Sequence, residues 1–210
     1  MNLVIVIAAY NEEKTIGKTI ESVRSFAKVL VVNDGSSDRT AEIAGEHGAI
    51  VYNQSNAGYD GALEAGFKQA ALLGATHVIT FDADGQHPVE AIPQYKAKFS
   101  EGCHLVVGIR PRKQRLAESI FGFYTKIFYG IDDPLCGMKG YQLDLYRQIG
   151  HFDSYKSTGT ELMLRYLKSG LKHAQIPITI NDREDAPRFG RVWRANKYIL
   201  KSLFNGIIKI

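Results

Sequence analysis

The sequence predicts an α/β protein with one domain, in which a mostly parallel sheet is covered by helices on both faces. Short apolar runs rich in β-branched residues alternate with helical patterns through the first half of the chain, which is typical of consecutive βαβ units. The chain has 210 residues, enough for one well-packed core, and no internal repeat or low-complexity linker divides it. We therefore expect a single folded unit.

Five apolar runs are the expected strands of this first half, and turn or polar residues bound each of them. They cover residues 3–10, 28–35, 49–53, 77–84 and 104–110. The helices between them are expected at residues 12–27, 36–48, 61–74 and 88–99. Ile16, Ile20 and Val23 recur on one face of the first helix, and a Ser or Asp near the start of the second helix is a suitable cap.

Residues 114–131 form an aromatic-rich segment with the spacing of a helix. Its periodic apolar positions are Leu116, Ile120, Tyr124, Ile127 and Phe128. A helix that faces the core and a helix that contacts lipid would both show this spacing, so both interpretations stay open. A helix at residues 158–170 and a strand at residues 173–180 are expected to follow.

Positive charge is concentrated at the end of the chain. The net charge is +4, yet residues 186–210 hold six basic and no acidic side chains, whereas the first 185 residues hold 20 basic and 22 acidic ones. In residues 192–210 apolar side chains gather near one helical face and basic ones near another, as in a helix that lies on an anionic membrane surface. These side chains are Trp193, Leu200, Leu203, Phe204 and Ile207, and Arg194, Lys197 and Lys201. An amphipathic helix packed on the domain would look similar.

We therefore divide the chain into a main domain of residues 1–191 and a basic amphipathic helix of residues 192–210. Cys103 and Cys136 lie far apart without metal-ligand spacing, which indicates a reducing compartment. The apolar start of the chain lacks the features of a signal peptide, and no run approaches the roughly 18 apolar residues of a membrane span. We expect a cytoplasmic protein, and the basic tail carries no nucleic-acid recognition motif.

Polar residues follow each of the first four expected strands. The sequences are AYNEE, NDGSSD, NQSNAGYDG and DADGQH, in chain order. The carboxyl ends of parallel strands meet at one edge of a sheet, and this is where ligands bind in open α/β folds. The sequence therefore predicts a binding site at this edge.

Asp82 and Asp84 come directly at the end of an apolar strand, where two like charges repel unless a cation lies between them. Their carboxylates, with the amide of Gln86 and with His87 as a further candidate, suit a hard cation such as Mg²⁺ or Mn²⁺. Such a cation keeps positions for substrate phosphates and neutralises charge on a leaving phosphate. We therefore predict a Mg²⁺ or Mn²⁺ site at this strand end.

The second and third polar loops suit a nucleotide. The carboxylate of Asp34 can accept a hydrogen bond from a nucleobase, and Gly35 permits a close backbone approach. This loop also has Ser and Asp residues that could cap the following helix. In the third loop Gly58, Gly61 and Ala62 would let a helix start close to an anionic ligand, which helix N-termini favour.

Together these motifs resemble the family-2 glycosyltransferases of GT-A fold, a Rossmann-like α/β class, and within them the polyprenyl-phosphate group that includes dolichyl-phosphate mannose synthase. AAYNEE is similar to the family's opening strand and loop, VVNDGSSD to its base-binding loop and FDADGQHP to its metal motif. DDPLCGMKGY resembles the Asp-X-Thr-Ser-Gly-Phe-Arg-X-Tyr segment of the group. The chain departs from the pattern at Asn33, Cys136 and Lys139, where Asp, Ser and Arg are usual.

The resemblance implies a metal-dependent, inverting transfer of a sugar from a nucleotide-diphospho-sugar with uridine or guanosine. The nucleotide-sugar would contact Ala9, Tyr10, Glu12, Asp34, Asn56, Gly61, Asp82 and Ala83. The metal would be held by Asp82, Asp84 and Gln86, and catalytic roles would fall to Asp84, Glu161 and Lys139. Many members carry membrane spans after this point, so we expect peripheral attachment to the cytoplasmic face of the membrane or a separate anchor protein.

Two acceptors remain open. A lipid monophosphate, with a second pKa near ~6, is a ready nucleophile that needs cations rather than a base. The candidates for binding it are Arg110, Arg112, Lys113, Arg115, Lys139, Arg183, Arg188 and Arg191. A sugar hydroxyl would instead need a base, for which Glu161 is the best candidate, although an acid in a first helical turn also has a structural role. A non-enzymatic phospho-acceptor module is less consistent with carboxylates after the second and fourth strands.

Overall fold

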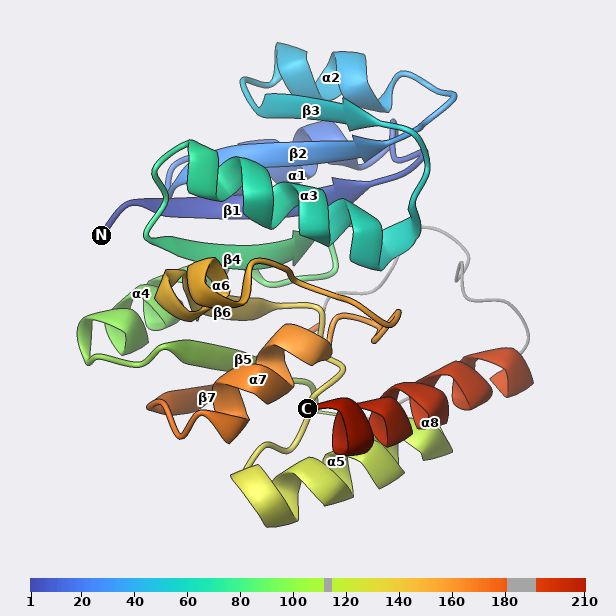
Figure 1. The fold of residues 1–210 in the computed structure, drawn as a ribbon. Coiled ribbons are helices and arrows are strands. Elements are labelled where there is room, and N and C mark those ends of the chain that lie inside the picture. Colours follow the sequence, from blue (N-terminus) through green and yellow to red (C-terminus); the bar gives the residue numbers. More distant parts are fainter. Residues whose placement is uncertain (112–114, 181–191) are drawn as a thin grey trace.

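A computed structural model describes residues 1–111, 115–180 and 192–210, without the side chains of residues 192–195. Within these residues the chain forms one seven-stranded sheet with the order β3-β2-β1-β4-β6-β5-β7 (Figure 1). Every neighbouring pair is parallel except those of β6, which runs antiparallel to β4 and β5. The predicted fold class, a mostly parallel α/β sheet, is confirmed.

The strands are β1 (Leu3–Ala9), β2 (Lys28–Asp34), β3 (Ile50–Gln54), β4 (His77–Asp82), β5 (Leu105–Ile109), β6 (Lys139–Gln142) and β7 (His173–Pro177). All six expected runs form strands, and β6 is the one that the sequence did not predict. It is four residues long and contains Gly140, which weakens any local strand signal. Gly140 pairs with Ile79 on one side and Val106 on the other, so β6 is a strand because its neighbours pair with it.

The helices are α1 (Ile16–Val23), α2 (Thr40–Glu46), α3 (Gly58–Leu72), the 3₁₀ turn η1 (Val89–Ala91), α4 (Ile92–Ser100), α5 (Leu116–Tyr129), α6 (Asp144–Ile149), α7 (Glu161–Lys168) and α8 (Val192–Lys209). The short helix α6 was not predicted. Gly130 and Gly150 follow α5 and α6 in the left-handed conformation that ends many helices.

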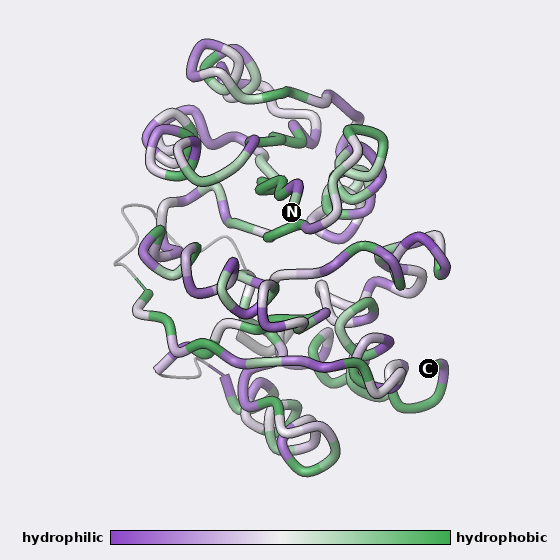
Figure 2. Tube along the Cα trace, turned by 90° about the vertical axis from the view of Figure 1, so that its left-hand side faces the viewer, coloured by the Kyte–Doolittle hydropathy of each residue, from purple (hydrophilic) through white to green (hydrophobic). Residues whose placement is uncertain are grey.

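The core has two layers because side chains alternate between the two faces of each strand. Val4 and Val6 of β1 belong to the layer that α3, α5, α7 and α8 cover, while Ile5 and Ile7 belong to the layer under α1, α2 and α4. β1 is therefore buried on both faces, as expected of a central strand in a parallel sheet. In Figure 2 the central strands are largely green, whereas the surface helices mix green and purple.

Helix α8 packs on the domain through only part of its apolar surface. Ile199 and Leu203 are buried in the same core layer as α5, and Ser202 between them is also buried. The sequence pattern indicated one helical face for Leu200, Leu203 and Phe204. In the structure Leu203 is buried, whereas Leu200 and Phe204 are exposed. No helix in the described part of the chain is long and apolar enough to cross a bilayer.

Replacing Gly66 tests the close packing of α3 on the sheet. A Cβ at this position would lie 2.3 Å from Cγ1 of Val6, a buried and χ1-restricted side chain of β1. Gly66→Ala should therefore lower the free energy of unfolding by about 1–3 kcal/mol through overpacking. The control Gly45→Ala lies in α2 with nothing within 4 Å and should stabilise by about 0.5–1 kcal/mol. Urea unfolding measures both, and equal midpoints for the two variants would contradict this account.

Candidate active site

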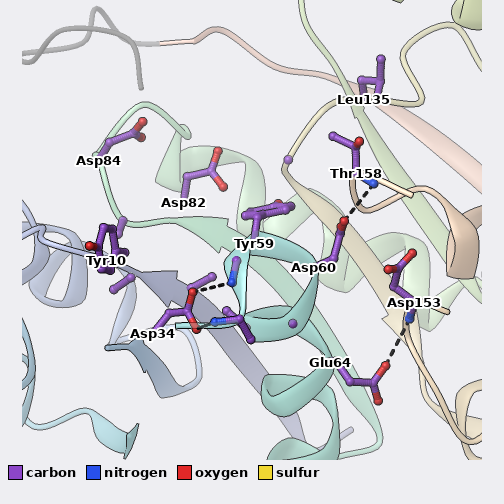
Figure 3. Close-up of a pocket in the computed structure, with 18 of the residues that line it drawn as sticks. Tyr10, Asp34, Tyr59, Asp60, Glu64, Asp82, Asp84, Leu135, Asp153 and Thr158 are labelled. Atoms are coloured by element: carbon purple, nitrogen blue, oxygen red, sulfur yellow. Dashed lines mark hydrogen bonds between the residues drawn. The ribbon is translucent and has the colours of Figure 1, made fainter. Parts of the chain in front are cut away.

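A cavity of about 910 Å³ opens at the carboxyl ends of β1, β2 and β4. Its position is the sheet edge where the sequence places the polar loops, and its volume is in the upper part of the range for ligand pockets. Twelve of the predicted site residues line it: Ala9, Tyr10, Glu12, Asp34, Asn56, Gly61, Asp82, Ala83, Asp84, Gln86, Arg110 and Lys139. Figure 3 shows several of these side chains around one space.

The loops after β1 and β2 are tied to each other by side chains. The N–H of Asn11 donates to Oγ of Ser36 at 2.9 Å, and the N–H of Ser37 donates to Oδ1 of Asn11 at 2.8 Å. The N–H of Glu12 donates to Oγ1 of Thr40 at 2.7 Å, which connects the first loop to the start of α2. The two loops therefore form one wall of the cavity rather than two independent segments.

Asp34 has a structural role that the sequence did not reveal. Its Oδ1 accepts from the N–H of Ala57 at 2.8 Å and from the amide of Gln54 at 2.7 Å, and its Oδ2 accepts from the N–H of Gly58 at 2.9 Å. The carboxylate thus caps the start of α3 from a different element, as the dashed lines in Figure 3 show. A carboxylate offers about four acceptor positions, so a nucleobase would share Asp34 with these groups.

His87 orients Asp82 at the end of β4. The N–H of Asp82 donates to Nδ1 of His87 at 3.0 Å, which leaves the ring proton on Nε2, 3.3 Å from Oδ2 of the same Asp82. A Cβ on Gly137 would lie 2.8 Å from Oδ2 of Asp82 and 3.0 Å from Cε1 of His87. The histidine is therefore a support for the carboxylate, and Gly137 leaves room for it.

Asp84 and Gln86 lie beside Asp82 on the loop after β4 and also line the cavity. The N–H of Gln86 donates to Oδ1 of Asp84 at 3.1 Å, which holds the loop compact. Across the described residues no three His, Cys, Asp or Glu side chains gather as a complete metal cage. Two carboxylates and an amide oxygen fit a cation such as Mg²⁺ or Mn²⁺, which binds few protein ligands when substrate phosphates supply the rest.

Lys139 places a buried positive charge in the cavity wall. The residue is 4% exposed, and its Nζ donates to the carbonyl of Gly159 at 3.2 Å. Burial lowers the pKa of Lys139, while the carboxylates of Asp133 and Asp82 oppose the shift. An anion that enters the cavity would favour the charged form of this side chain.

Arg110 and Arg115 are committed to ion pairs rather than directed at a ligand. Arg110 binds Asp133 through Nε at 2.7 Å and Nη2 at 2.8 Å, and its Nη2 lies 3.2 Å from Glu118. Arg115 binds Glu118 at 2.9 Å and does not line the cavity. The expectation that Arg115 holds the acceptor therefore receives no support, and Arg110 contributes a wall whose charge is already balanced.

Glu161 does not lie where a general base would act. Its side chain is fully buried and is absent from the cavity lining. Its carboxylate accepts from Nη2 of Arg165 at 2.8 Å, from Oγ of Ser154 at 2.9 Å, and contacts Nε2 of His151 at 3.1 Å. Burial raises the pKa of Glu161, but these hydrogen bonds together lower it below its ordinary value. In the structure Glu161 therefore holds Ser154, His151 and Arg165 together, and its role as a base stays a prediction.

Residues 152–160, which no sequence motif indicated as part of the site, form the far wall of the cavity. Lys156 and Thr158 have positive φ angles of 58° each, an unfavourable conformation for side chains other than Gly. Two acids of α3 hold this segment. Asp60 accepts from the N–H groups of Thr158 at 3.1 Å and Gly159 at 2.6 Å, and Glu64 accepts from those of Phe152 and Asp153.

Asp60 is an unusual acid within this wall. Burial and the neighbouring Asp153 carboxylate raise the pKa of Asp60 to about 6. Nothing in the sequence around Asp60 distinguishes it from an ordinary first-turn helix acid, because its partners lie about 100 residues away. Arg112, Lys113, Arg183, Arg188 and Arg191, which were also candidates for binding the acceptor, lie outside the described residues.

A large cavity, bordered by paired carboxylates at the carboxyl edge of this sheet, is the ligand site expected of an open α/β enzyme. The chain belongs to glycosyl transferase family 2, because the model of that family matches residues 4–157. The resemblance of the four sequence motifs to this family is thereby confirmed.

Two relatives of the chain have names that refer to a lipid phosphate. The chain is 31% identical to the dolichyl-phosphate hexose transferase of Haloferax volcanii, over 87% of this chain and 84% of that protein. It is 26% identical to the undecaprenyl-phosphate mannosyltransferase of Micrococcus luteus, over 88% and 85% of the two chains. In fold it matches glucosyl-3-phosphoglycerate synthase of Mycobacterium tuberculosis in complex with Mn²⁺ and UDP-glucose, with a TM-score of 0.79 and 20% identity over 98% of this chain and 78% of that one.

Asp60 should give the protein a pH-dependent stability. Its ordinary pKa is 3.8 and its pKa in the folded state is about 6, so between these values the folded protein binds the extra proton. The free energy of unfolding should therefore fall as the pH rises from about 4 to about 6. Thermal unfolding of wild type and Asp60→Asn from pH 4 to 7.5 measures this, and the wild type should lose stability relative to the variant as the pH rises. Parallel curves would contradict the shift, and Asp153→Asn should move the window to lower pH.

Removing the charge of Glu161 should affect folding before chemistry. Glu161→Gln leaves Arg165 without its buried partner and should lower the free energy of unfolding by about 3 kcal/mol. The control Glu42→Gln breaks a solvent-exposed pair with Arg39 and should leave the unfolding midpoint unchanged. A Glu161→Gln variant that is as stable as wild type but transfers no sugar would support the base role.

Proposed function

We propose that this glycosyltransferase moves a sugar from a nucleotide-diphospho-sugar to a polyprenyl phosphate, in a metal-dependent reaction that inverts the anomeric carbon. One observation carries the proposal. Asp82, Asp84 and Gln86 line the same cavity as residues of the nucleotide-type loops and the buried cation Lys139. The names of the Haloferax and Micrococcus relatives support a lipid phosphate as the acceptor.

The nucleoside would lie against the wall formed by the loops after β1 and β2. Tyr10 is 43% exposed at this wall and offers an aromatic surface, while Asp34 and Asn56 offer polar groups. Gly35 has a φ of 75°, and a Cβ there would lie 2.9 Å from the N–H nitrogen of Asn56. Glycine at this position therefore keeps the two loops close together around the nucleoside.

The diphosphate would lie beside Ala83, where Asp82, Asp84 and Gln86 would hold Mg²⁺ or Mn²⁺. Such an ion supplies Lewis-acid chemistry, since it neutralises the charge that develops on the leaving diphosphate. His87 keeps the Asp82 carboxylate oriented toward this position. The bond from the anomeric carbon to the diphosphate oxygen breaks, and the nucleoside diphosphate leaves with the electron pair.

The acceptor phosphate would lie near Lys139. At neutral pH a phosphate monoester is largely a dianion, with a second pKa near ~6, so one of its oxygens attacks the anomeric carbon without a base. Lys139 has the charge and the burial to hold this anion, because it lies in the wall between Asp82 and the carbonyl of Gly159. The absence of a base requirement agrees with the structural role of Glu161. We place the reaction at the cytoplasmic face of a membrane.

A transfer assay with matched variants tests this proposal. Wild type is incubated with Mn²⁺ or Mg²⁺ and uridine or guanosine diphospho-sugars, with and without polyprenyl phosphate. Product should require both metal and lipid phosphate. Asp84→Asn should lower the rate at least about 100-fold, because charge neutralisation of a leaving group is worth several kcal/mol.

Binding measurements separate the parts of the proposal. Calorimetry should show that the nucleotide diphosphate binds wild type only when the divalent ion is present. In Asp84→Asn, adding the ion should no longer increase this binding. The control Glu46→Gln changes a solvent-exposed acid of α2 and should match wild type in both assays. Transfer that survives a chelator, or that proceeds equally without lipid phosphate, would refute the proposal.

A further inference from the structure

Among the residues that the structure describes, helix α5 presents a row of large apolar side chains to solvent. Leu116, Ile120, Phe123 and Ile127 recur at helical spacing, and Leu116 and Phe123 are 74% and 65% exposed. The opposite side of the same helix is buried through Ala117 and Phe121. The sequence left open whether this helix faces the core or a lipid surface. Within the described residues one side of the helix is buried and the other side is exposed.

Helix α8 repeats this arrangement beside α5. Its exposed apolar residues are Leu200, Phe204, Ile207 and Ile208, of which Phe204 and Ile208 are 62% and 63% exposed. Its buried residues Ile199 and Leu203 enter the same core layer as those of α5. The two helices lie side by side at the lower edge of the molecule in Figure 1. Because both bury their inner sides in one layer, their apolar rows face away from the sheet and form one surface, which we call the α5–α8 face.

On the described surface of α5 and α8 the exposed charges are lysines, and the nearby acid Asp132 is paired with Lys126 of α5. Glu118 is the single acid of the two helices, and it is buried and paired with Arg110 and Arg115. Lys197 and Lys201 are exposed on α8 next to the apolar row. A surface of this kind is complementary to anionic headgroups above an apolar interior. A second copy of the same face would instead bring a second positively charged surface against this one, which charge repulsion opposes.

Helix α8 and the segment after α5 also reach the cavity. Tyr198 of α8 is 56% exposed and lines the cavity, as does Leu135 in the segment that follows α5. The helix that carries one of the two apolar rows therefore also supplies a residue of the cavity that contains Lys139. Exposed apolar patches of this extent are uncommon on soluble monomers and mark interaction surfaces.

We propose that the α5–α8 face docks on an anionic lipid bilayer, with its apolar side chains at the acyl boundary and its lysines among the headgroups. The inference rests on the proposed function in one respect. A polyprenyl phosphate resides in a bilayer, so an enzyme that uses it must reach the bilayer surface. It goes further by assigning the contact to two helices that are 63 or more residues apart, including one outside the basic tail. The cavity then opens at the bilayer surface, where the acceptor phosphate lies.

Vesicle flotation of the full chain tests the face directly. The vesicles contain phosphatidylcholine alone or with about 30% phosphatidylglycerol, and salt is raised from low to high because screening weakens surface charge attraction. Wild type should float with the anionic vesicles and bind the neutral ones more weakly. Phe123→Asp with Phe204→Asp should lose at least tenfold in vesicle affinity, since both side chains are exposed and the fold does not need them.

Leu72→Asp is the matched control, because Leu72 is 73% exposed at the end of α3, outside the α5–α8 face. It should bind vesicles as wild type does. Equal flotation of the double variant and the wild type, or no flotation of the wild type, would overturn the proposal. A dimer of the wild type that the double variant dissociates would also overturn it in favour of a second copy as the occupant.

Two further readouts distinguish failure of this surface from failure of the proposed function. Metal-dependent binding of nucleotide diphosphate should be unchanged in the double variant, because the substitutions lie outside the nucleotide wall. Transfer to a polyprenyl phosphate in vesicles should fall at least tenfold, while transfer to a shortened, water-soluble prenyl phosphate should persist. Vesicle binding without any transfer would support the α5–α8 face as a membrane contact and contradict the proposed function.

Discussion

The cavity depends on carboxylates that bind backbone N–H groups. The walls are irregular segments, and every N–H group buried there needs a partner because an unsatisfied one costs about 1–3 kcal/mol. Asp34 supplies partners at the start of α3, and Asp60 and Glu64 supply them along residues 152–160. Glu161 does the same for Ser154. These acids connect α3, β2 and α7 to loops that would otherwise have no fixed geometry.

The acids of the site therefore have two different kinds of role. Asp34, Glu64 and Glu161 are occupied by N–H groups, and Glu161 also by Arg165, so these three are poor candidates for acid-base chemistry. Asp82 differs, because it receives one imidazole contact and remains about one-third exposed toward the cavity. A phosphate acceptor suits such a site well, since it brings its own negative charge and needs a cation such as Lys139 to receive it.

Arg110 links the two functional regions of the molecule. It joins Asp133 in the cavity wall to Glu118 at the start of α5, and it neutralises both acids. The same pairing neutralises Glu118, the acid of α5, and so removes a negative charge that would weaken the attraction of the α5–α8 face for an anionic surface. A residue that the sequence suggested as a ligand for phosphate therefore maintains the wall and the helix on which the outer surface lies.

The sequence by itself determined the fold class, the edge of the sheet that carries the site, and the pair Asp82 and Asp84, because strand periodicity and strand ends are local properties. Only the tertiary structure decided that Lys139–Gln142 is a strand, that Glu161 is buried, and that Leu203 faces inward while Phe204 does not. Each of these depends on a neighbour distant in sequence, such as Val106 for β6 or Ser154 for Glu161. Periodicity shows that a side chain is apolar or charged, but the packing partner decides what that side chain contacts.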